Sequence, residues 1–288
     1  LNQKERNNMN ANSIVVGNFK GGTGKSTSTQ MLGFVNAFYK KRKTLLIDLD
    51  PQANASEVMS FTADNLGNHF YQENGFPKTI WNVLYDGSLD GAVLPLIENL
   101  DLIAGNIAMS DYSDFMSAKF PNDKLAQFEY FANILAPLKE EYDEIFIDVP
   151  PSLGTIVQSA MYFAEYVAIM LQTQPKSIRG AADYIDYMEF FTERYNTQLG
   201  IAGIIPFMLD TKTSTESYMY NEAKKLYGDN LINTIVFRSA RLIRYDETGI
   251  TLETKKNGEL KKVDANPQNT FISILDELNE HISWFEEE

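Results

Sequence analysis

The chain contains no cysteine among its 288 residues, and it carries only two histidines. The lack of cysteine excludes disulfide bridges, zinc–thiolate centres and cysteine-ligated iron–sulfur clusters within this chain. It also fits a protein that works in a reducing cytoplasm. His69 lies in a predicted loop and His281 in a predicted terminal helix, so we expect both on the surface and neither in a metal pair.

Long apolar runs are also missing. No stretch of about 18 consecutive apolar residues occurs, so we expect no membrane-spanning helix. The first residues, "LNQKERNNMNAN", are polar and lack the apolar centre of a signal peptide. We expect residues 1–12 to form a flexible N-terminal extension. Residues 13–288 show no repeat or linker, which predicts a single domain.

Positive charge is scarce. The chain has 25 Lys and Arg against 39 Asp and Glu, which gives a formal net charge of −14. That balance argues against nucleic acid as a partner, but it does not exclude a local basic patch. The densest basic material in the second half is Arg238, Arg241 and Arg244, followed by Lys255 and Lys256 beside an Asn-Gly hairpin turn. We predict that these five residues line a DNA-binding face; solvated or salt-bridged charge is the alternative for each.

Apolar, strand-like runs alternate with helical patterns along the chain. The predicted strands are residues 13–19, 44–50, 100–105, 143–150, 166–172, 200–207 and 231–237. The predicted helices are residues 25–41, 123–139, 155–164, 177–194, 214–227 and 268–285, and the polar segment 61–78 reads as a loop. This alternation predicts an α/β fold, with a doubly wound, mostly parallel sheet and helices on both of its faces.

A glycine-rich stretch, "VVGNFKGGTGKSTSTQML", follows the first predicted strand. It resembles the phosphate-binding pattern G-x-x-x-x-G-K-[ST], except that Phe19 occupies the first position and Lys20 follows it. Glycines allow a tight loop whose N–H groups point at phosphate oxygens, and the following helix adds its positive end. The predicted nucleotide-binding residues are Gly21, Gly22, Thr23, Gly24, Lys25, Ser26 and Thr27. In this loop Lys25 would reach the terminal phosphates, Ser26 would bind Mg²⁺ and Thr27 would donate to an inner phosphate.

Three aspartates stand at the ends of predicted strands. "LLIDLDPQAN" places Asp48 and Asp50 there, and "IFIDVPPS" places Asp148. Ligands of open α/β sheets bind outside these carboxyl ends, and phosphoryl transfer needs acids for Mg²⁺ and for the attacking water. The three aspartates are therefore predicted to lie beside the phosphate loop.

Together these motifs resemble a known family. "FKGGTGKST", "LLIDLDPQANAS" and "FIDVPPSLG" are similar, in order and spacing, to the deviant Walker A, Walker A′ and Walker B motifs of the ParA/Soj/MinD ATPases. The resemblance is strongest to ParA/Soj-type partition ATPases, in the small plasmid form without an N-terminal helix-turn-helix. It implies a P-loop NTPase fold and a slow, partner-stimulated ATPase that uses ATP and Mg²⁺.

The resemblance also implies roles for individual residues. Lys20 would act in catalysis on the nucleotide of the partner subunit in a sandwich homodimer, Lys25 would act within its own subunit, and Asp50 would orient the attacking water. Ser26, Asp48 and Asp148 would hold Mg²⁺, and Met208 and Asp210 are expected adenine contacts. The ATP dimer would bind DNA without sequence preference.

A small centromere-binding partner, ParB-like or of the ribbon-helix-helix type, would stimulate hydrolysis and so drive DNA segregation. We therefore expect a cytoplasmic, nucleoid-associated protein with no membrane partner. The alternative is an orphan relative that positions a protein cargo or cycles on a membrane. Its membrane form conflicts with the acidic ending "HISWFEEE", which an anionic bilayer would repel.

Overall fold

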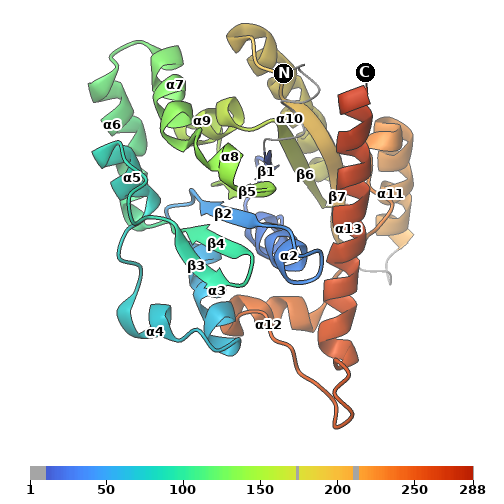
Figure 1. Ribbon diagram of the computed structural model, residues 1–288. Helices are drawn as coiled ribbons and strands as arrows, with labels where there is room; N and C mark the ends of the chain where they lie inside the picture. The colour runs from blue at the N-terminus through green and yellow to red at the C-terminus, as the bar shows by residue number, and fades with distance from the viewer. Residues whose placement is uncertain (1–10, 173–174, 210–213, 288) are drawn as a thin grey trace.

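The computed structural model describes residues 11–172, 175–209 and 214–287 (Figure 1). Within these ranges the chain forms an eight-stranded sheet of order β3-β4-β2-β5-β1-β6-β7-β8. The strands are β1 (Asn12–Gly17), β2 (Thr44–Asp48), β3 (Leu94–Ile97), β4 (Leu100–Ile103), β5 (Glu144–Asp148), β6 (Tyr166–Gln172), β7 (Gly200–Leu209) and β8 (Val236–Phe237). All neighbours are parallel except β3 and β4, which confirms the predicted fold class.

Helices connect most of the strands. They are α2 (Lys25–Phe38), α3 (Asn54–Asn65), α4 (Phe70–Asn74), α5 (Ile80–Asp86), α6 (Tyr112–Lys119), α7 (Lys124–Leu135), α8 (Leu138–Glu141), α9 (Thr155–Phe163), α10 (Pro175–Tyr195), α11 (Ser214–Tyr227), α12 (Ala240–Thr248) and α13 (Lys262–Glu287), with 3₁₀ turns at Ile107–Asp111 and Gly228–Asn230. None of the helices that the structure describes is both long enough and apolar enough to cross a lipid bilayer.

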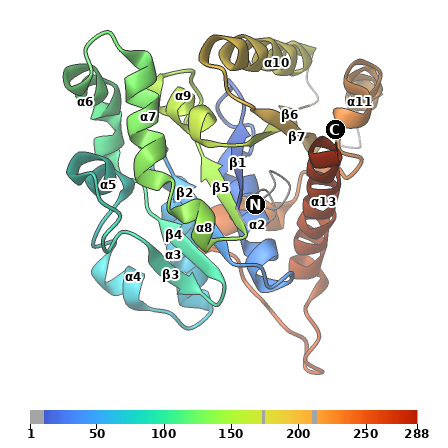
Figure 2. The same ribbon diagram turned by 45° about the horizontal axis from the view of Figure 1, so that its top comes forward.

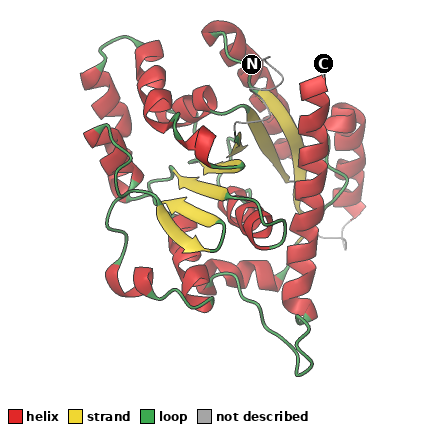
Figure 3. Ribbon diagram, in the orientation of Figure 1, coloured by secondary structure: helices red, strands yellow, loops and turns green. Residues whose placement is uncertain are grey.

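The central strands are buried on both faces, which explains their continuous apolar sequence. In β1, Val15 packs into one hydrophobic cluster, whereas Ile14 and Val16 pack into the other. The Val15 cluster includes residues of α5 to α11, and the second cluster includes residues of α2, α3, α12 and α13. Figure 2 shows α9 and α10 on the side of the sheet away from α2, and Figure 3 shows the strands between the two helical layers.

Several elements differ from the prediction. Residues 61–78 were expected to be a loop, but they contain the end of α3 and all of α4. The expected strand 231–237 shortens to β8, preceded by an isolated parallel bridge between Leu231 and Ile204. Helix α13 starts at residue 262 rather than at 268, with Pro267 inside it. The antiparallel edge strand β3 was not predicted, because it has only four residues and pairs through an irregular register.

The two histidines have different surroundings, and the prediction for one of them is wrong. His69 is exposed and pairs with Asp64 at 2.6 Å, as expected of a surface residue. His281 is only 7% exposed: its Nδ1 lies 3.1 Å from the carbonyl oxygen of Ala202, and its ring stacks on Trp284. This histidine therefore helps to pack α13 against β7.

Candidate nucleotide-binding site

The glycine-rich loop joins β1 to α2 at the carboxyl edge of the sheet. Gly22 and Gly24 have φ values of 71° and 85°, in the left-handed region that side chains other than glycine rarely adopt. A Cβ on Gly24 would also lie 2.1 Å from the ring of Phe207. Glycine is therefore required at the last position before α2. The first N–H groups of a helix have no partner within it, so the loop and the start of α2 form a site for anions.

A cavity of about 760 Å³ opens at this loop. All seven predicted phosphate-binding residues line it, from Gly21 to Thr27, and so do Asp50, Pro150 and Pro151. The strand-end segments that follow β2 and β5 thus face the phosphate loop across one space. The parallel sheet brings them together, because the carboxyl ends of β1, β5 and β2 lie side by side.

The two lysines of the loop point to different places. Lys25 is 6% exposed and lines the cavity, and its Nζ donates a hydrogen bond to the backbone oxygen of Lys20 at 3.1 Å. Burial lowers the pKa of Lys25, while Asp148 and Asp50 oppose that shift. The side chain of Lys20 is not among the described residues that line the cavity. Its Cε lies 3.9 Å from the position of a Cβ built on Gly180, beside α10.

Asp48 is buried at the end of β2, and the protein itself uses its carboxylate. Oδ2 accepts hydrogen bonds from the backbone N and the Oγ of Ser56 at 2.8 and 2.7 Å, and Oδ1 accepts from the backbone N of Asp50 at 3.1 Å. Burial raises the pKa of Asp48 to about 6, and the bonds from Ser56 oppose this shift. In this arrangement Asp48 holds the segment that carries Asp50.

Asp148 stands beside Asp48 in register on β5, but its carboxylate is not used in this way. It is fully buried, and neither of its oxygens has a hydrogen-bond partner of normal geometry among the described residues. Burial and the nearby Asp48 raise its pKa, whereas Ser26 and Lys25 are close enough to lower it. A buried, unpartnered carboxylate next to a phosphate loop fits a group that completes the surroundings of Mg²⁺.

No cluster of three or more acidic or histidine side chains in the described ranges forms a ready-made metal cage. That observation fits Mg²⁺, which keeps several waters and takes ligands from substrate phosphates. Among the predicted metal residues, Ser26 lines the cavity and is the candidate for direct ligation. Asp148 is the candidate acid that supports Mg²⁺ behind Ser26. The carboxylate of Asp48 already accepts hydrogen bonds from Ser56.

Asp50 lies on the cavity wall in a tight turn. Its Oδ1 accepts a hydrogen bond from the backbone N of Gln52 at 2.9 Å, and its backbone oxygen accepts one from Ala53. Ala53 has a φ of 54°, which is uncommon for a residue other than glycine. Such local strain occurs where the surrounding structure requires it, and here it leads from Asp50 into α3. The turn leaves Asp50 facing the space where a phosphate would bind.

Several residues at the site were not predicted, and three of them make side-chain hydrogen bonds there. Ser56 orients Asp48 and also accepts a hydrogen bond from the backbone N of Gly105. Gln172, at the end of β6, donates from Nε2 to the backbone oxygen of Gly22 at 2.7 Å. Asp246, on α12, lines the cavity beside Thr27, whose hydroxyl donates to its Oδ1 at 3.4 Å. Ser56 lies within the motif "LLIDLDPQANAS" and Gln172 ends the predicted strand 166–172, so both had a signal in the sequence, whereas Asp246 lies in none of the three motifs.

The predicted adenine contacts fall outside what the structure describes. Met208 belongs to β7, but the position of its side chain is not described, and Asp210 lies in the undescribed segment 210–213.

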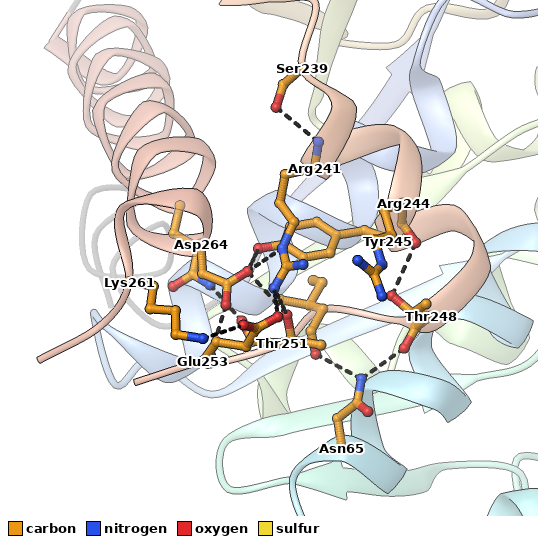
Figure 4. Close-up of polar contacts among 12 residues, drawn as sticks. Asn65, Ser239, Arg241, Arg244, Tyr245, Thr248, Thr251, Glu253, Lys261 and Asp264 are labelled. Carbon is orange, nitrogen blue, oxygen red and sulfur yellow. Dashed lines mark hydrogen bonds and ion pairs between the residues drawn. The ribbon is translucent and has the colours of Figure 1, made fainter. Parts of the chain in front are cut away.

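Arg241, one of the predicted DNA-binding residues, is held inside the protein (Figure 4). Its side chain is 12% exposed, and its Nε donates to Asp264 at 2.6 Å. A second nitrogen, Nη2, donates to Glu253 at 2.5 Å and to Thr251 at 2.8 Å. Asp264, which is fully buried, also accepts from the hydroxyl of Tyr245 at 2.7 Å. This network, which we call the Arg241 cluster, joins α12 to the start of α13.

The other basic candidates are more accessible. Arg238, Arg244 and Lys256 are exposed and form no ion pair with any residue that the structure describes. Lys255 is exposed but pairs with Glu259 at 2.8 Å across the hairpin, which the bridge between Thr254 and Leu260 confirms. The structure therefore leaves three of the five predicted residues with a positive charge that no described carboxylate neutralises.

Comparisons with known proteins agree with this geometry. Residues 11–201 match a family model described as an AAA domain. The chromosome-partitioning ATPase Soj of Treponema pallidum is 30% identical over 243 residues, which are 84% of this chain and 88% of that protein. The sporulation initiation inhibitor protein Soj of Bacillus subtilis is 28% identical over 80% of this chain and 85% of its own length.

A solved structure shares the fold. It is a putative plasmid partition protein from Borrelia burgdorferi B31 bound to AMPPNP, with a TM-score of 0.70 and 23% identity over 94% of this chain and 99% of that one. At 23% identity, this structural similarity shows only that the two proteins share a fold. Membership of the family is shown by the family model and by the Soj relatives. The chain therefore belongs to the AAA-domain family and, within it, to the ParA/Soj-type partition ATPases.

Proposed function

We propose that the chain hydrolyses ATP slowly with Mg²⁺, and that its ATP-bound homodimer binds DNA without sequence preference. A small centromere-binding protein, ParB-like or ribbon-helix-helix, stimulates hydrolysis and releases the DNA, and the cycle segregates a plasmid or chromosome. The action takes place in the cytoplasm on the nucleoid.

The observation that carries this proposal is the divergence of the two loop lysines. Lys25 is buried against its own phosphate loop, so it serves the nucleotide of its own subunit. Lys20 is directed toward α10 rather than into the same cavity, so a role on a second nucleotide across a dimer interface accounts for its position. Positive charge supplied near the transferred phosphate stabilises the transition state, and an interface that supplies it makes hydrolysis depend on dimerisation.

The roles of the acids follow from their surroundings. Neither carboxylate oxygen of Asp148 has a hydrogen-bond partner of normal geometry among the described residues, which supports a role of Asp148 in holding Mg²⁺ behind Ser26. Asp50 faces the cavity and orients the attacking water. Asp48 contributes by fixing Asp50 and Ser56 in place. Met208 and Asp210 remain our candidates for the adenine contacts.

DNA binding in three nucleotide states tests the function. We expect binding with ATP but neither with ADP nor without nucleotide, with equal affinity for unrelated sequences and a steep decrease with salt. Lys25→Ala should lose ATP binding and hence DNA binding, whereas a variant at Lys78, which is half-buried and is not among the described residues that line the cavity, should match the wild type. DNA binding that is independent of nucleotide, or absent with ATP, would contradict the proposal.

A second function is favoured by the Arg241 cluster and by the pair of Lys255 with Glu259, because these contacts neutralise two of the five predicted basic residues. It is an ATPase that positions a protein cargo or cycles on a membrane. Anionic vesicles in the same nucleotide series separate the possibilities: ATP-dependent binding to vesicles in place of DNA would support this second function.

A further inference from the structure

Asp246 places a carboxylate in the nucleotide cavity that none of the three motifs explains. It lies on α12, more than 200 residues from the phosphate loop, and it lines the same cavity as Lys25 and Ser26. Its Oδ1 accepts a long hydrogen bond of 3.4 Å from the hydroxyl of Thr27. The residue is exposed, yet partial burial of its carboxylate raises its pKa, and Thr27 opposes that shift.

The hydroxyl of Thr27 cannot serve two acceptors, because it has one hydrogen to donate. When a phosphate binds to the loop, Thr27 is placed to donate to it, and the contact with Asp246 is lost. The carboxylate then faces a second anion at short range in a half-enclosed site, where like charges repel more strongly than in bulk water. A long hydrogen bond is weak, so little opposes the exchange.

The rest of α12 is tied to other elements. Arg241 and Tyr245 bind Asp264 on α13, and the Nδ2 of Asn65 on α3 donates to the backbone oxygens of Thr248 and Ile250 at 2.8 and 3.1 Å (Figure 4). When Asp246 moves away from the phosphate, it therefore pulls on a helix that is also attached to α3 and α13. The exposed Arg238 and Arg244 lie just before α12 and within it.

We propose that Asp246 is a nucleotide-sensing residue: bound phosphate takes the hydroxyl of Thr27, and the repelled carboxylate loosens α12 from the phosphate loop. The proposal rests on the proposed function only in that the cavity binds ATP. It implies that in the nucleotide-free protein the Thr27–Asp246 contact holds α12 against the phosphate loop, and that this contact lowers the affinity for ATP.

The test compares Asp246→Asn with Glu247→Gln in the full chain. Both variants remove one negative charge from α12, but Glu247 is exposed and is not among the described residues that line the cavity. We expect Asp246→Asn to bind ATP on the order of tenfold more tightly at low salt, with a smaller gain at high salt, and Glu247→Gln to match the wild type. Unchanged or weaker ATP binding by Asp246→Asn would overturn the proposal.

Hydrogen exchange provides a second readout that does not involve DNA. In the wild type, ATP should accelerate amide exchange in residues 240–248, and in Asp246→Ala, which has no acceptor for the hydroxyl of Thr27, this exchange should already be fast without nucleotide. Slow exchange in the nucleotide-free variant would also overturn the proposal. If the wild type binds no ATP, the proposed function itself fails; if it binds ATP normally while the variant behaves like it, only the role of Asp246 fails.

Discussion

Asp48 and Asp148 stand in register at the ends of the adjacent parallel strands β2 and β5, but only one of them is satisfied by the protein. Asp48 accepts three hydrogen bonds from Ser56 and Asp50. Both oxygens of Asp148 are buried without a partner among the described residues. The two neighbouring acids thus differ in their surroundings: Asp48 ties Ser56 and Asp50 together, whereas Asp148 is the acid that we propose for Mg²⁺.

Asp148→Asn should stabilise the nucleotide-free protein, because it removes a buried carboxylate that lacks hydrogen bonds. An increase in stability of 1 kcal/mol would raise the melting temperature by roughly 2–4 °C. The same variant should lose the additional thermal stabilisation that Mg²⁺ and ATP give the wild type. Asp48→Asn is the matched control, and it should be destabilised by about 1–3 kcal/mol, since it disrupts the bonds from Ser56. Equal destabilisation of both variants would contradict the assignment.

Asp50→Ala should retain ATP binding and dimerisation but stop turnover. Among the described residues, the carboxylate of Asp50 accepts a hydrogen bond only from Gln52 in its own turn, so its removal leaves the phosphate loop intact. Equilibrium titration with ATP and steady-state release of phosphate measure the two properties separately. Loss of nucleotide binding would show that Asp50 holds the ligand rather than the attacking water.

Glu144 should make stability depend on pH. It is fully buried at the start of β5, and its Oε2 accepts from Asn36 at 2.7 Å. Its Oε1 and the Oδ1 of Asn36 are both buried acceptors without a donor among the described residues. Burial raises the pKa of Glu144 from 4.5 to about 7, although Arg42 lies 3.7 Å away and opposes the shift. If Oε1 of Glu144 carries a proton, it becomes a hydrogen-bond donor, and this pair of buried acceptors then includes one donor.

The direction of the effect follows from the raised pKa. Between about pH 4.5 and 7 the folded protein retains a proton that the unfolded chain releases, so stability decreases as pH rises, and it levels off above pH 7. Glu144→Gln keeps a donor at every pH and should be more stable than the wild type by about 1–3 kcal/mol at pH 8, but not near pH 4.5. Denaturant unfolding at the two pH values measures the difference. A variant that is less stable at pH 8 would refute the prediction.

Arg241 and Arg244 should respond differently to alanine substitution. Arg241→Ala leaves the buried Asp264 without its ion partner and should cost about 3–5 kcal/mol of stability. Arg244→Ala, at an exposed site without an ion pair among the described residues, should leave stability within about 0.5 kcal/mol. It should weaken DNA binding equally on unrelated sequences and reduce the salt slope by about 1. Normal DNA binding by Arg244→Ala would remove this residue from the DNA-binding face.

The sequence predicted those parts of the site that depend on short, local residue patterns: the phosphate loop and the aspartates at the strand ends. A loop such as Gly21 to Ser26 needs particular residues at fixed spacing, and strands that end in aspartate mark the same edge of a parallel sheet. The contacts of Asp246 with Thr27 and of Arg241 with Asp264 join positions 219 and 23 residues apart, and no local pattern encodes them. For the same reason a basic cluster in the sequence did not reveal that Arg241 has internal partners.

Complementation between two inactive variants tests the central claim most directly. Lys20→Ala keeps Asp50 but lacks the lysine that we propose acts on the partner subunit, and Asp50→Ala has the opposite defect. In a mixed dimer the Asp50→Ala subunit supplies Lys20 to the intact Asp50 site of its partner. An equal mixture should therefore regain about a quarter of wild-type ATPase activity, because half of the dimers are mixed and each has one complete site. If the mixture stays as inactive as its components while both variants bind ATP and dimerise, Lys20 does not act across the interface.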